Sequence, residues 1–409
     1  MERKEKTKRM GEAIGYDHFG RGIIKQEGKV VFVPHVKKGD TVSYIMVKEK
    51  KHYAIGRTIF EEKTLCPSYQ ECGGCQILHL SYPEQLAFKQ EKVKNILEHY
   101  TKYSYEKEIP ILKTEPFFYR NKVILHIKGK EIGFYQEETN KIVPFSTCLL
   151  LKKKMLEVIA SIRFFLQKEQ GLTEAMIRVL EDQVLLSLKG TLSKKKISSF
   201  FLPLCDILFY NEEALTKKTQ LEVKIFDTLF VVSKDSFFQV NDLGLKKIYQ
   251  TVIDFVKDTK RGIAFDLYCG TGTLSLLIAP YEKEVYGVEL SKEAIRNANV
   301  SKKRNNIENV SFFAQDTGVF LSQNKKTPDL ILVDPPRAGL SKKVRQQMKE
   351  CSPKYILYVS CDPLTLARDL EEFRESYQLE NMVAIDEFPN TYHMECVALL
   401  MRKVTKRFH

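Results

Sequence analysis

The chain has 409 residues, of which 43% are hydrophobic, and a formal net charge of +13. This length exceeds what one hydrophobic core usually supports, so two or three domains are expected. No apolar run approaches the roughly 18 residues of a membrane span, and the first residues resemble no signal peptide, so we expect a cytoplasmic protein. Nine cysteines, an odd number, are typical of thiols or metal ligands rather than of a disulfide framework.

Positive charge is concentrated near the N-terminus, where residues 1–60 hold 14 Lys and Arg against 7 Asp and Glu. This excess favours a polyanionic partner, most commonly nucleic acid, over a merely solubilising charge. From Gly11 to about Phe60, short alternating apolar runs separated by glycine predict a small closed barrel. Basic residues at its strand edges, such as Lys48 and Arg57, favour RNA binding over a purely structural cap.

The stretch from 62 to 235 begins with a cysteine-rich loop and continues with mixed secondary structure. Apolar residues at helical spacing predict a helix from Glu84 to about Tyr100, and a second helix is expected near 152–168. Strands are predicted at 123–127 and 184–188. We therefore expect an α+β domain between the barrel and the C-terminal part of the chain.

Three cysteines of this loop, Cys66, Cys72 and Cys75, form a C-x5-C-x2-C pattern, and Cys148 follows far downstream. Four thiolates can hold either a tetrahedral zinc or a [4Fe-4S] cluster. Structural zinc sites usually combine two close pairs, so three clustered cysteines and one distant cysteine favour the iron–sulfur cluster. The five-residue first spacing, where a radical enzyme would have three, favours a structural or RNA-positioning cluster.

From about residue 236, buried apolar runs alternate with helical segments. The strand runs are expected at 262–266, 284–288, 329–333 and 355–359. This rhythm predicts a doubly wound parallel α/β sheet, which binds ligands at the carboxyl ends of its strands.

A glycine loop, Asp266-Leu-Tyr-Cys-Gly-Thr-Gly-Thr273, follows the first of these strands and begins a helix, as nucleotide-type loops do. A dinucleotide fingerprint would have glycine where Ser275 stands, and Asp266 would repel a pyrophosphate. S-adenosylmethionine carries an ammonium and a sulfonium group, which that carboxylate favours. Glu289 can accept hydrogen bonds from both ribose hydroxyls. Asp316 can reach the adenine amine, although a solvated turn aspartate is the alternative.

The sequence after the next predicted strand, Asp334-Pro-Pro-Arg337, fixes a carboxylate at a strand end. Many amino-methyltransferases have an aromatic residue where Arg337 stands, so this cation argues against nitrogen methylation. Arg337 suits stabilisation of an enolate oxygen or binding of a phosphate, and a surface ion pair is the alternative.

A thiol and a carboxylate lie near the C-terminus: Cys361 follows a predicted strand, and Glu395 comes 34 residues later. The nearby helix N-terminus and Arg337 are expected to lower the pKa of Cys361. Cys269 is a rival thiol within the glycine loop, and Glu395 could be a strand-edge charge. C5 of uracil is a weak nucleophile until a thiol adds to C6, and a base must later remove the C5 proton. The pair therefore predicts C5 methylation of a pyrimidine.

From about Gly11 to Met401 the chain resembles the bacterial RNA uracil-5-methyltransferases of the 23S rRNA type, which carry an N-terminal TRAM barrel. The resemblance implies a TRAM domain over 1–61, a central α+β domain over 62–235 and a Rossmann-like class I methyltransferase domain over 236–409. It implies that Cys361 is the nucleophile and Glu395 the base, acting on a uridine flipped out of a loop or bulge of 23S rRNA. It also implies that the cysteines listed above ligate a [4Fe-4S] cluster.

The same resemblance implies the remaining site residues. Those expected to contact S-adenosylmethionine are Gln239, Asp266, Tyr268, Gly270, Thr273, Glu289, Asp316 and Asp334. Those expected to contact the uridine are Phe237, Asp334 and Arg337. Relatives commonly have asparagine where this chain has Thr273, which leaves the contact of Thr273 open.

Two other functions stay open at this point. A tRNA-directed enzyme is a near alternative, although such relatives typically lack both the barrel and the cluster. A non-catalytic RNA-binding assembly factor is a more distant one, and it would be expected to lack the nucleophile or the base. We expect a monomer with 23S rRNA as its partner and no membrane association.

Overall fold

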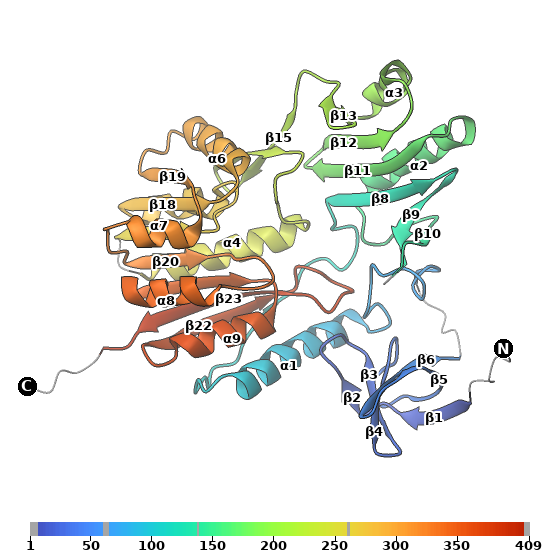
Figure 1. Cartoon of the computed structure of the whole chain (residues 1–409), viewed down its shortest axis with the longest axis horizontal. Coiled ribbons are helices and arrows are strands. Elements are labelled where there is room, and N and C mark those ends of the chain that lie inside the picture. The colour runs from blue at the N-terminus through green and yellow to red at the C-terminus, as the bar shows by residue number, and fades with distance from the viewer. Residues whose placement is uncertain (1–6, 60–64, 137–138, 260–261, 405–409) are drawn as a thin grey trace, which may run out of the picture.

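The structure is a computed structural model that describes residues 7–59, 65–136, 139–259 and 262–404. Figure 1 shows three sheets: a small N-terminal sheet, a central sheet and a large C-terminal sheet. No helix within the described residues has the length and apolarity needed to cross a membrane. The expected boundary between residues 61 and 62 lies outside the described residues, and the division into three domains stays a prediction.

The N-terminal sheet has the strand order β1-β5-β6-β4-β3-β2. Its strands are β1 (Lys8–Glu12), β2 (Gly15–Tyr16), β3 (Gly22–Gln26), β4 (Lys29–Val33), β5 (Thr41–Glu49) and β6 (Tyr53–Thr58). Only Ala13 and Ile14 separate β1 from β2, and Ile14 N donates to Ile23 O at 2.8 Å. The two outer strands therefore lie on one continuous segment, and the sheet curls round a small core that contains Val31 and Tyr44.

Helix α1 (Tyr82–Tyr100) connects the N-terminal sheet to the rest of the chain. It begins at a capping box between Ser81 and Glu84, and it buries Phe88 and Val93 on one face. Helix α1 packs against α9 (Pro363–Phe373), and the strand that follows, β7 (Ile111–Leu112), pairs with β22 (Tyr377–Ile385). This segment thus attaches to the C-terminal sheet, although most of its neighbours in sequence belong to the central one.

The central sheet has the order β10-β9-β8-β11-β12-β13-β14. Its strands are β8 (Lys122–Lys128), β9 (Glu131–Tyr135), β10 (Ile142–Pro144), β11 (Leu172–Leu180), β12 (Gln183–Gly190), β13 (Ile207–Tyr210) and β14 (Glu213–Ala214). Helices α2 (Lys153–Lys168) and α3 (Lys194–Phe201) lie along one face of this sheet (Figure 1). Their apolar side chains, such as Ile159 and Phe201, complete its core.

The C-terminal sheet has the order β19-β18-β17-β20-β21-β23-β22-β7. Its remaining strands are β17 (Ile263–Leu267), β18 (Glu284–Glu289), β19 (Val310–Ala314), β20 (Leu330–Val333), β21 (Tyr355–Ser360) and β23 (Glu395–Arg402). The helices that cover it, besides α1 and α9, are α4 (Asp242–Lys257), α5 (Thr273–Ile278), α6 (Lys292–Arg304), α7 (Thr317–Gln323) and α8 (Lys342–Cys351). The hairpin of β15 (Gln220–Ile225) and β16 (Thr228–Ser233) packs on α6.

This sheet is mixed, so the expectation of an all-parallel sheet was wrong in one respect. Strands β17 to β21 are parallel, but β23 pairs antiparallel with both β21 and β22. The sequence analysis missed β22. A loop without a helix, residues 386–394, joins β22 to β23, and a parallel pair would require a longer crossover.

Candidate active site

The mixed sheet brings the predicted thiol and carboxylate to the same edge. The parallel strands end where Asp266, Asp334 and Cys361 lie, and the antiparallel β23 begins there with Glu395. Ser360 of β21 is paired with Cys396 of β23. Because the two strands run in opposite directions, the residue after Ser360 and the residue before Cys396 face each other across the ladder. Cys361 and Glu395 are therefore neighbours.

The Cys361 thiol is half-buried at the start of helix α9. Asp362 caps that helix, because its Oδ1 accepts hydrogen bonds from Leu364 N at 2.8 Å and Thr365 N at 3.4 Å. Burial and then the Glu395 carboxylate raise the pKa of Cys361 to about 11, although Arg337 acts in the opposite direction. The expectation of a lowered pKa was thus wrong for the free protein, since burial and a neighbouring anion outweigh the cation.

Glu395 is almost fully buried, and its Oε2 has no hydrogen-bond partner among the described residues. Burial and the neighbouring Asp334 carboxylate raise the pKa of Glu395, and Arg337 opposes this shift. Burial also raises the pKa of Asp334, to about 7. A carboxylate in this environment is a stronger base than one in water, which suits removal of a proton from carbon.

The glycine loop between β17 and α5 has the backbone shape of a ligand-binding turn. Gly270 and Gly272 have φ values of +54° and +75°, and a Cβ on Gly272 would lie 2.5 Å from Phe312. Glu289, at the end of β18, accepts hydrogen bonds from Gly270 N at 3.3 Å and Ser291 N at 2.9 Å. The loop therefore lies between two strand ends and presents its backbone there.

Asp266 is completely buried below this loop. Its Oδ2 accepts a hydrogen bond from Ser275 Oγ at 2.5 Å, whereas its Oδ1 has no partner among the described residues. Burial raises the pKa of Asp266 to about 7. A buried carboxylate oxygen without a donor fits a cationic group of a bound ligand, and S-adenosylmethionine has such a group.

The other expected donor contacts lie around the same edge. Tyr268 has a left-handed backbone with φ of +66°, and Thr273 begins α5 with a buried side chain. Asp316 caps helix α7 by accepting a hydrogen bond from Val319 N at 3.0 Å. Gln239 is buried just before α4, whereas the ring of Phe237 is 72% exposed. Cys269, the rival thiol, is buried, and burial raises its pKa.

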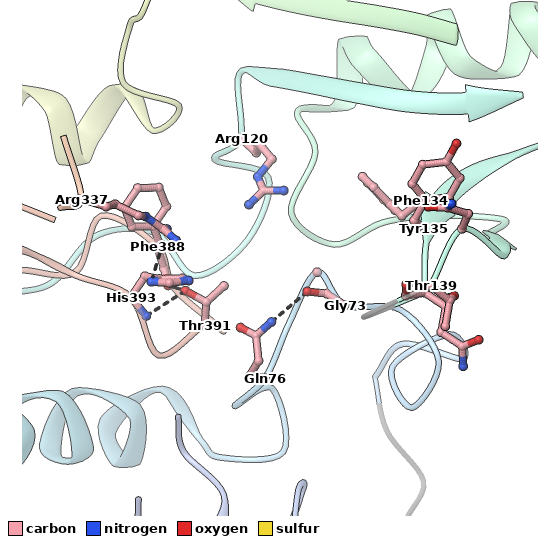
Figure 2. Close-up of a pocket in the computed structure, with 13 residues that line it drawn as sticks. Gly73, Gln76, Arg120, Phe134, Tyr135, Thr139, Arg337, Phe388, Thr391 and His393 are labelled. Atoms are coloured by element: carbon pink, nitrogen blue, oxygen red, sulfur yellow. Dashed lines mark hydrogen bonds between the residues drawn. The ribbon is translucent and has the colours of Figure 1, made fainter. Parts of the chain in front are cut away.

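A cavity of about 740 Å³ opens beside this site (Figure 2). Its wall combines residues of the cysteine loop, the central sheet and the loop before β23. These residues include Gly73, Gln76, Arg120, Tyr135, Arg337, Phe388 and His393. Arg337 Nη2 lies 3.5 Å from His393 Nδ1, and burial followed by Arg337 lowers the pKa of His393 to about 3. The imidazole is therefore neutral and adds no second positive charge beside Arg337.

Arg120 is a cavity residue that the sequence analysis did not identify. Figure 2 shows its guanidinium between Arg337 and the central sheet. Neither arginine forms a salt bridge among the described residues, although Arg337 acts electrostatically on Cys361 and Glu395, so the cavity holds two cations. Arg120 follows Tyr119 in an irregular segment without a recognisable motif, and β-bridges to Leu151 and Asn241 hold it here. Two such cations suit a polyanion.

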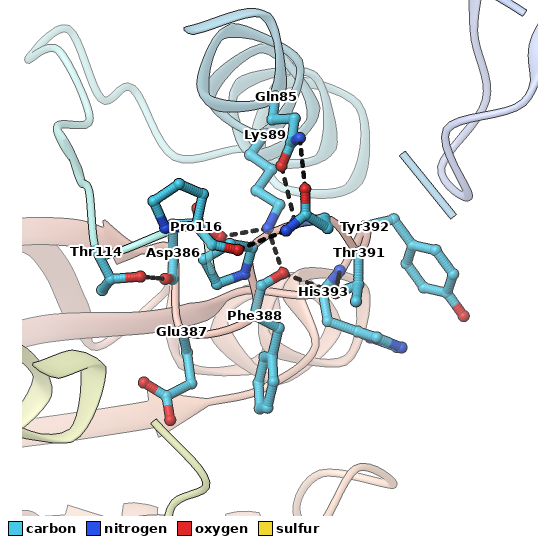
Figure 3. A network of polar contacts seen from close by, with 12 residues as sticks. Gln85, Lys89, Thr114, Pro116, Asp386, Glu387, Phe388, Thr391, Tyr392 and His393 are labelled. Carbon is cyan, nitrogen blue, oxygen red and sulfur yellow. Dashed lines mark hydrogen bonds and ion pairs between the residues drawn. The ribbon is translucent and has the colours of Figure 1, made fainter. Parts of the chain in front are cut away.

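A buried polar network holds the loop that leads to Glu395 (Figure 3). Lys89 of α1 donates to Asp386 and, at 3.0 Å, to Phe388 O, and neither Lys89 nor Asp386 is exposed. Gln85 and Asn390 exchange two hydrogen bonds of 3.0 and 2.8 Å. Loss of one partner from a buried ion pair typically costs about 3–5 kcal/mol. Helix α1 thus holds the loop of residues 386–394, which precedes Glu395 and β23, in place.

The four cysteines expected to bind a cluster lie in one region. Burial raises the pKa of Cys75 and Cys148, and Cys66, Cys72, Cys75 and Cys148 act electrostatically on one another. However, no group of three or more Cys, His, Asp or Glu side chains within the described residues could hold a metal ion. The [4Fe-4S] cluster on these four cysteines is therefore not shown and stays a prediction. Protonated thiols do not attract one another, whereas a bound metal would draw the sulfurs together.

Comparison with known proteins agrees with this geometry. Residues 207–403 match the family described as tRNA (uracil-5-)-methyltransferase. An uncharacterized RNA methyltransferase of Clostridium acetobutylicum is 33% identical, with 95% of each chain covered. One from Staphylococcus epidermidis is 28% identical, with 98% of each chain covered.

The structure of Pyrococcus abyssi tRNA (uracil-54, C5)-methyltransferase in complex with S-adenosyl-L-homocysteine has the same fold. Its TM-score is 0.80 at 24% identity, and the alignment covers 96% of this chain and 100% of that one. The fold and the strand-end site define a class I S-adenosylmethionine-dependent methyltransferase. The chain belongs to the RNA uracil-5-methyltransferase family and is an enzyme of that activity.

Proposed function

We propose that this enzyme methylates C5 of a uridine in a loop or bulge of 23S rRNA, with Cys361 as the nucleophile and Glu395 as the base. The observation that carries the proposal is the pairing of Ser360 with Cys396, because it brings this thiol and this carboxylate together beside the glycine loop. Bound S-adenosylmethionine supplies the methyl group. No other described thiol has a carboxylate opposite it in the ladder at this edge.

The steps follow from the positions of the side chains. The Cys361 thiol releases its proton to solvent and adds as a thiolate to C6. The electron pair of the C5–C6 double bond moves toward the O4 carbonyl, which makes C5 a nucleophile. Arg337 stabilises the negative charge on that oxygen, and it also favours the thiolate. After the methyl group has moved to C5, Glu395 removes the C5 proton. The electrons of that bond restore the double bond, and the Cys361 thiolate leaves.

The proposed donor contacts are those expected from the sequence. Asp266 binds the ammonium group, which is supported by its buried Oδ1 without a partner. Glu289 binds the ribose hydroxyls, because its carboxylate already faces the loop through Gly270 N. The residues that complete the site are Gln239, Tyr268, Gly270, Thr273, Asp316 and Asp334. Phe237 and Asp334 contact the uridine, and the exposed ring of Phe237 is free to stack on a base.

The RNA that carries the target uridine has two candidates, 23S rRNA and tRNA. Absence of the barrel from tRNA-directed relatives was expected to separate the two. The Pyrococcus abyssi enzyme, which acts on tRNA, covers 96% of this chain, so its fold extends over the N-terminal sheet as well. The barrel therefore does not discriminate, and a tRNA uridine is a second candidate.

Mapping of 5-methyluridine decides between these substrates. We expect one or more 5-methyluridines in 23S rRNA to disappear when the gene is deleted and to return when it is restored. Mass spectrometry of nuclease digests of 23S rRNA and tRNA from the same cells measures both outcomes. Loss of 5-methyluridine from tRNA alone would identify the second candidate, and no change in either RNA would contradict the proposed activity.

We further propose that Cys66, Cys72, Cys75 and Cys148 bind a [4Fe-4S] cluster, with zinc as the alternative. Their gathering in one region and the glycines between Cys72 and Cys75 support a shared ligand. Such a cluster would hold the cysteine loop against the central sheet, where it forms one wall of the cavity. We also propose that the N-terminal sheet is a TRAM domain that binds RNA. The protein is proposed to be a monomer and to act in the cytoplasm.

Replacement of Cys72 by serine tests the cluster. Anaerobically prepared wild type should be brown and contain about four irons per chain, and the variant should lose the iron and the visible absorbance, because a cluster needs all its thiolate ligands. Cys205→Ser is the matched control, since Cys205 is half-buried in the central part of the chain but belongs to no cysteine group. Metal analysis and absorption spectra provide the readout. Stoichiometric zinc without iron would contradict the prediction.

A further inference from the structure

The turn between β2 and β3 of the N-terminal sheet is preformed. Asp17 Oδ1 accepts hydrogen bonds from Phe19 N and Arg21 N, both at 2.9 Å, and Asp17 Oδ2 accepts one from Arg21 Nε at 2.8 Å. Gly20 has a φ of +76°, and a Cβ there would lie 2.3 Å from Ile77 of the cysteine loop. These contacts fix the backbone of Phe19, while its ring remains 50% exposed.

The Phe19 ring is linked to the loop that precedes Glu395. It meets Tyr392 edge-on, with ring centroids 5.3 Å apart and planes at 90°, and the Arg21 guanidinium lies 5.1 Å from its centroid. The centroid of the Tyr392 ring is in turn 4.1 Å from that of the His393 ring, and His393 lines the 740 Å³ cavity beside the active site. Figure 3 shows Tyr392 on the side of this loop opposite Glu387. The side chains of His393, Tyr392 and Phe19 thus form a continuous series of ring contacts between the cavity and the N-terminal sheet.

A groove of about 560 Å³ passes over this turn. It shares Gly73, Gln76 and Gln136 with the 740 Å³ cavity beside the active site, so the two spaces adjoin. The N-terminal sheet contributes apolar residues, Arg21, His35 and Arg57 to this groove. Of these, Arg57 is an exposed cation without a hydrogen-bond or ion-pair partner among the described residues. Glu71 also lines the groove, but its carboxylate is paired with Lys141. An unpaired cation beside an exposed aromatic ring is an arrangement with which proteins bind single-stranded nucleic acid.

We propose that Phe19 is a stacking platform for the base of a nucleotide that flanks the target uridine, and that Arg57 binds a phosphate of the same strand. This inference rests on the proposed RNA substrate and extends it. The Tyr392 ring lies perpendicular to the Phe19 ring and Arg21 lies over it, and a base would stack on the part of Phe19 that stays exposed. Any base has a stacking face, so the platform recognises an unpaired strand rather than a sequence. Because hydrogen bonds already fix this turn in the free protein, binding of RNA costs little conformational entropy there.

Methylation of an unmodified 23S rRNA transcript by the full chain tests the platform. Phe19→Ala and Arg57→Gln should each raise KM for RNA roughly tenfold and leave kcat at saturating RNA unchanged. Phe19→Leu keeps the apolar bulk and removes the ring, so it should behave like Phe19→Ala if stacking matters. Arg57→Gln should also lower the slope of log affinity against log salt concentration by about 0.7.

Matched controls lie outside the groove. Phe164→Ala removes a 56% exposed ring from α2, and Lys25→Gln removes an exposed cation from β3 of the same barrel. Both should keep the wild-type KM. Wild-type KM values in Phe19→Leu and Arg57→Gln would overturn the proposal, as would an equal loss in the controls.

Direct binding separates failure of this inference from failure of the proposed function. If wild type methylates neither 23S rRNA nor tRNA transcripts, the activity assignment fails. Fluorescence anisotropy with a 15-nucleotide oligouridylate still measures the platform. A lower affinity for the oligouridylate in Phe19→Leu and Arg57→Gln supports the stacking platform, and an unchanged affinity overturns it. Tighter binding of polyglutamate than of the oligouridylate, lost in the same variants, would identify an acidic peptide as the occupant and would also overturn it.

Discussion

Replacement of Cys361 by alanine should abolish methyl transfer to RNA, with a fall in rate of at least about 10⁴-fold. Without addition of a thiol to C6, C5 of uracil is too weak a nucleophile to take the methyl group. Cys396 adjoins Glu395 on β23 but is fully buried, and no other described thiol lies opposite Glu395 across the pair of β21 and β23. Transfer of a tritiated methyl group to an RNA transcript under single-turnover conditions measures the effect.

Cys351→Ala is the matched control for this experiment. Cys351 is also a half-buried thiol near a buried strand, but it ends helix α8 and so lies at the opposite edge of the sheet. The control should keep the wild-type rate, and both variants should retain the thermal unfolding midpoint and RNA affinity of the wild type. Methylation by Cys361→Ala at the normal rate would show that no covalent intermediate is formed through this residue.

Replacement of Glu395 by glutamine should trap a covalent complex between the protein and methylated RNA. Addition of Cys361 and transfer of the methyl group do not need the carboxylate as a base, but elimination of the thiol requires removal of the C5 proton. Glutamine has nearly the same shape as glutamate and cannot remove that proton. The complex should accumulate to about one per active site, and denaturing gels with labelled methyl groups and intact-mass measurement should detect it.

Glu387→Gln provides the control for the trap. Glu387 is a second buried carboxyl group, in the loop of residues 386–394 that precedes Glu395. It accepts a hydrogen bond from Asn241 N at the start of α4 and does not face Cys361 in the strand register. No adduct should accumulate in this variant. Release of free methylated RNA by Glu395→Gln at the wild-type rate would remove Glu395 from its proposed role, and an adduct in Glu387→Gln would point to the other carboxyl.

Local patterns predicted most of the C-terminal sheet. Runs such as 329–333 and 355–359 are buried on both faces, so they are continuous apolar stretches that a sequence reveals directly. Strand β22 was missed because its residues alternate in burial and follow helix α9 without a turn signal. The direction of β23 depends on the length of the connection before it, and periodicity carries no information about direction.

The pKa values of the site residues were harder to predict from the sequence than the identity of those residues. Cys361 and Arg337 were expected to form a thiolate–cation pair, yet the pKa of Cys361 is raised, because burial and the Glu395 carboxylate outweigh Arg337. Arg120 was not identified at all. Its segment is irregular, and its place in the cavity results from the packing of the central sheet against the start of α4.

The sequence alone determined the chemical groups of this protein: a thiol, a carboxylate and a glycine loop, each placed at a strand end by local patterns of apolar and turn-forming residues. Those patterns are local because a strand and the turn after it depend on only a few neighbouring residues. Only the tertiary structure decided that β23 runs antiparallel and so sets Glu395 opposite Cys361, and that Arg120 and Arg337 share a cavity. Strand direction, burial and charge compensation depend on residues hundreds of positions apart, and their energies arise only when the chain has packed.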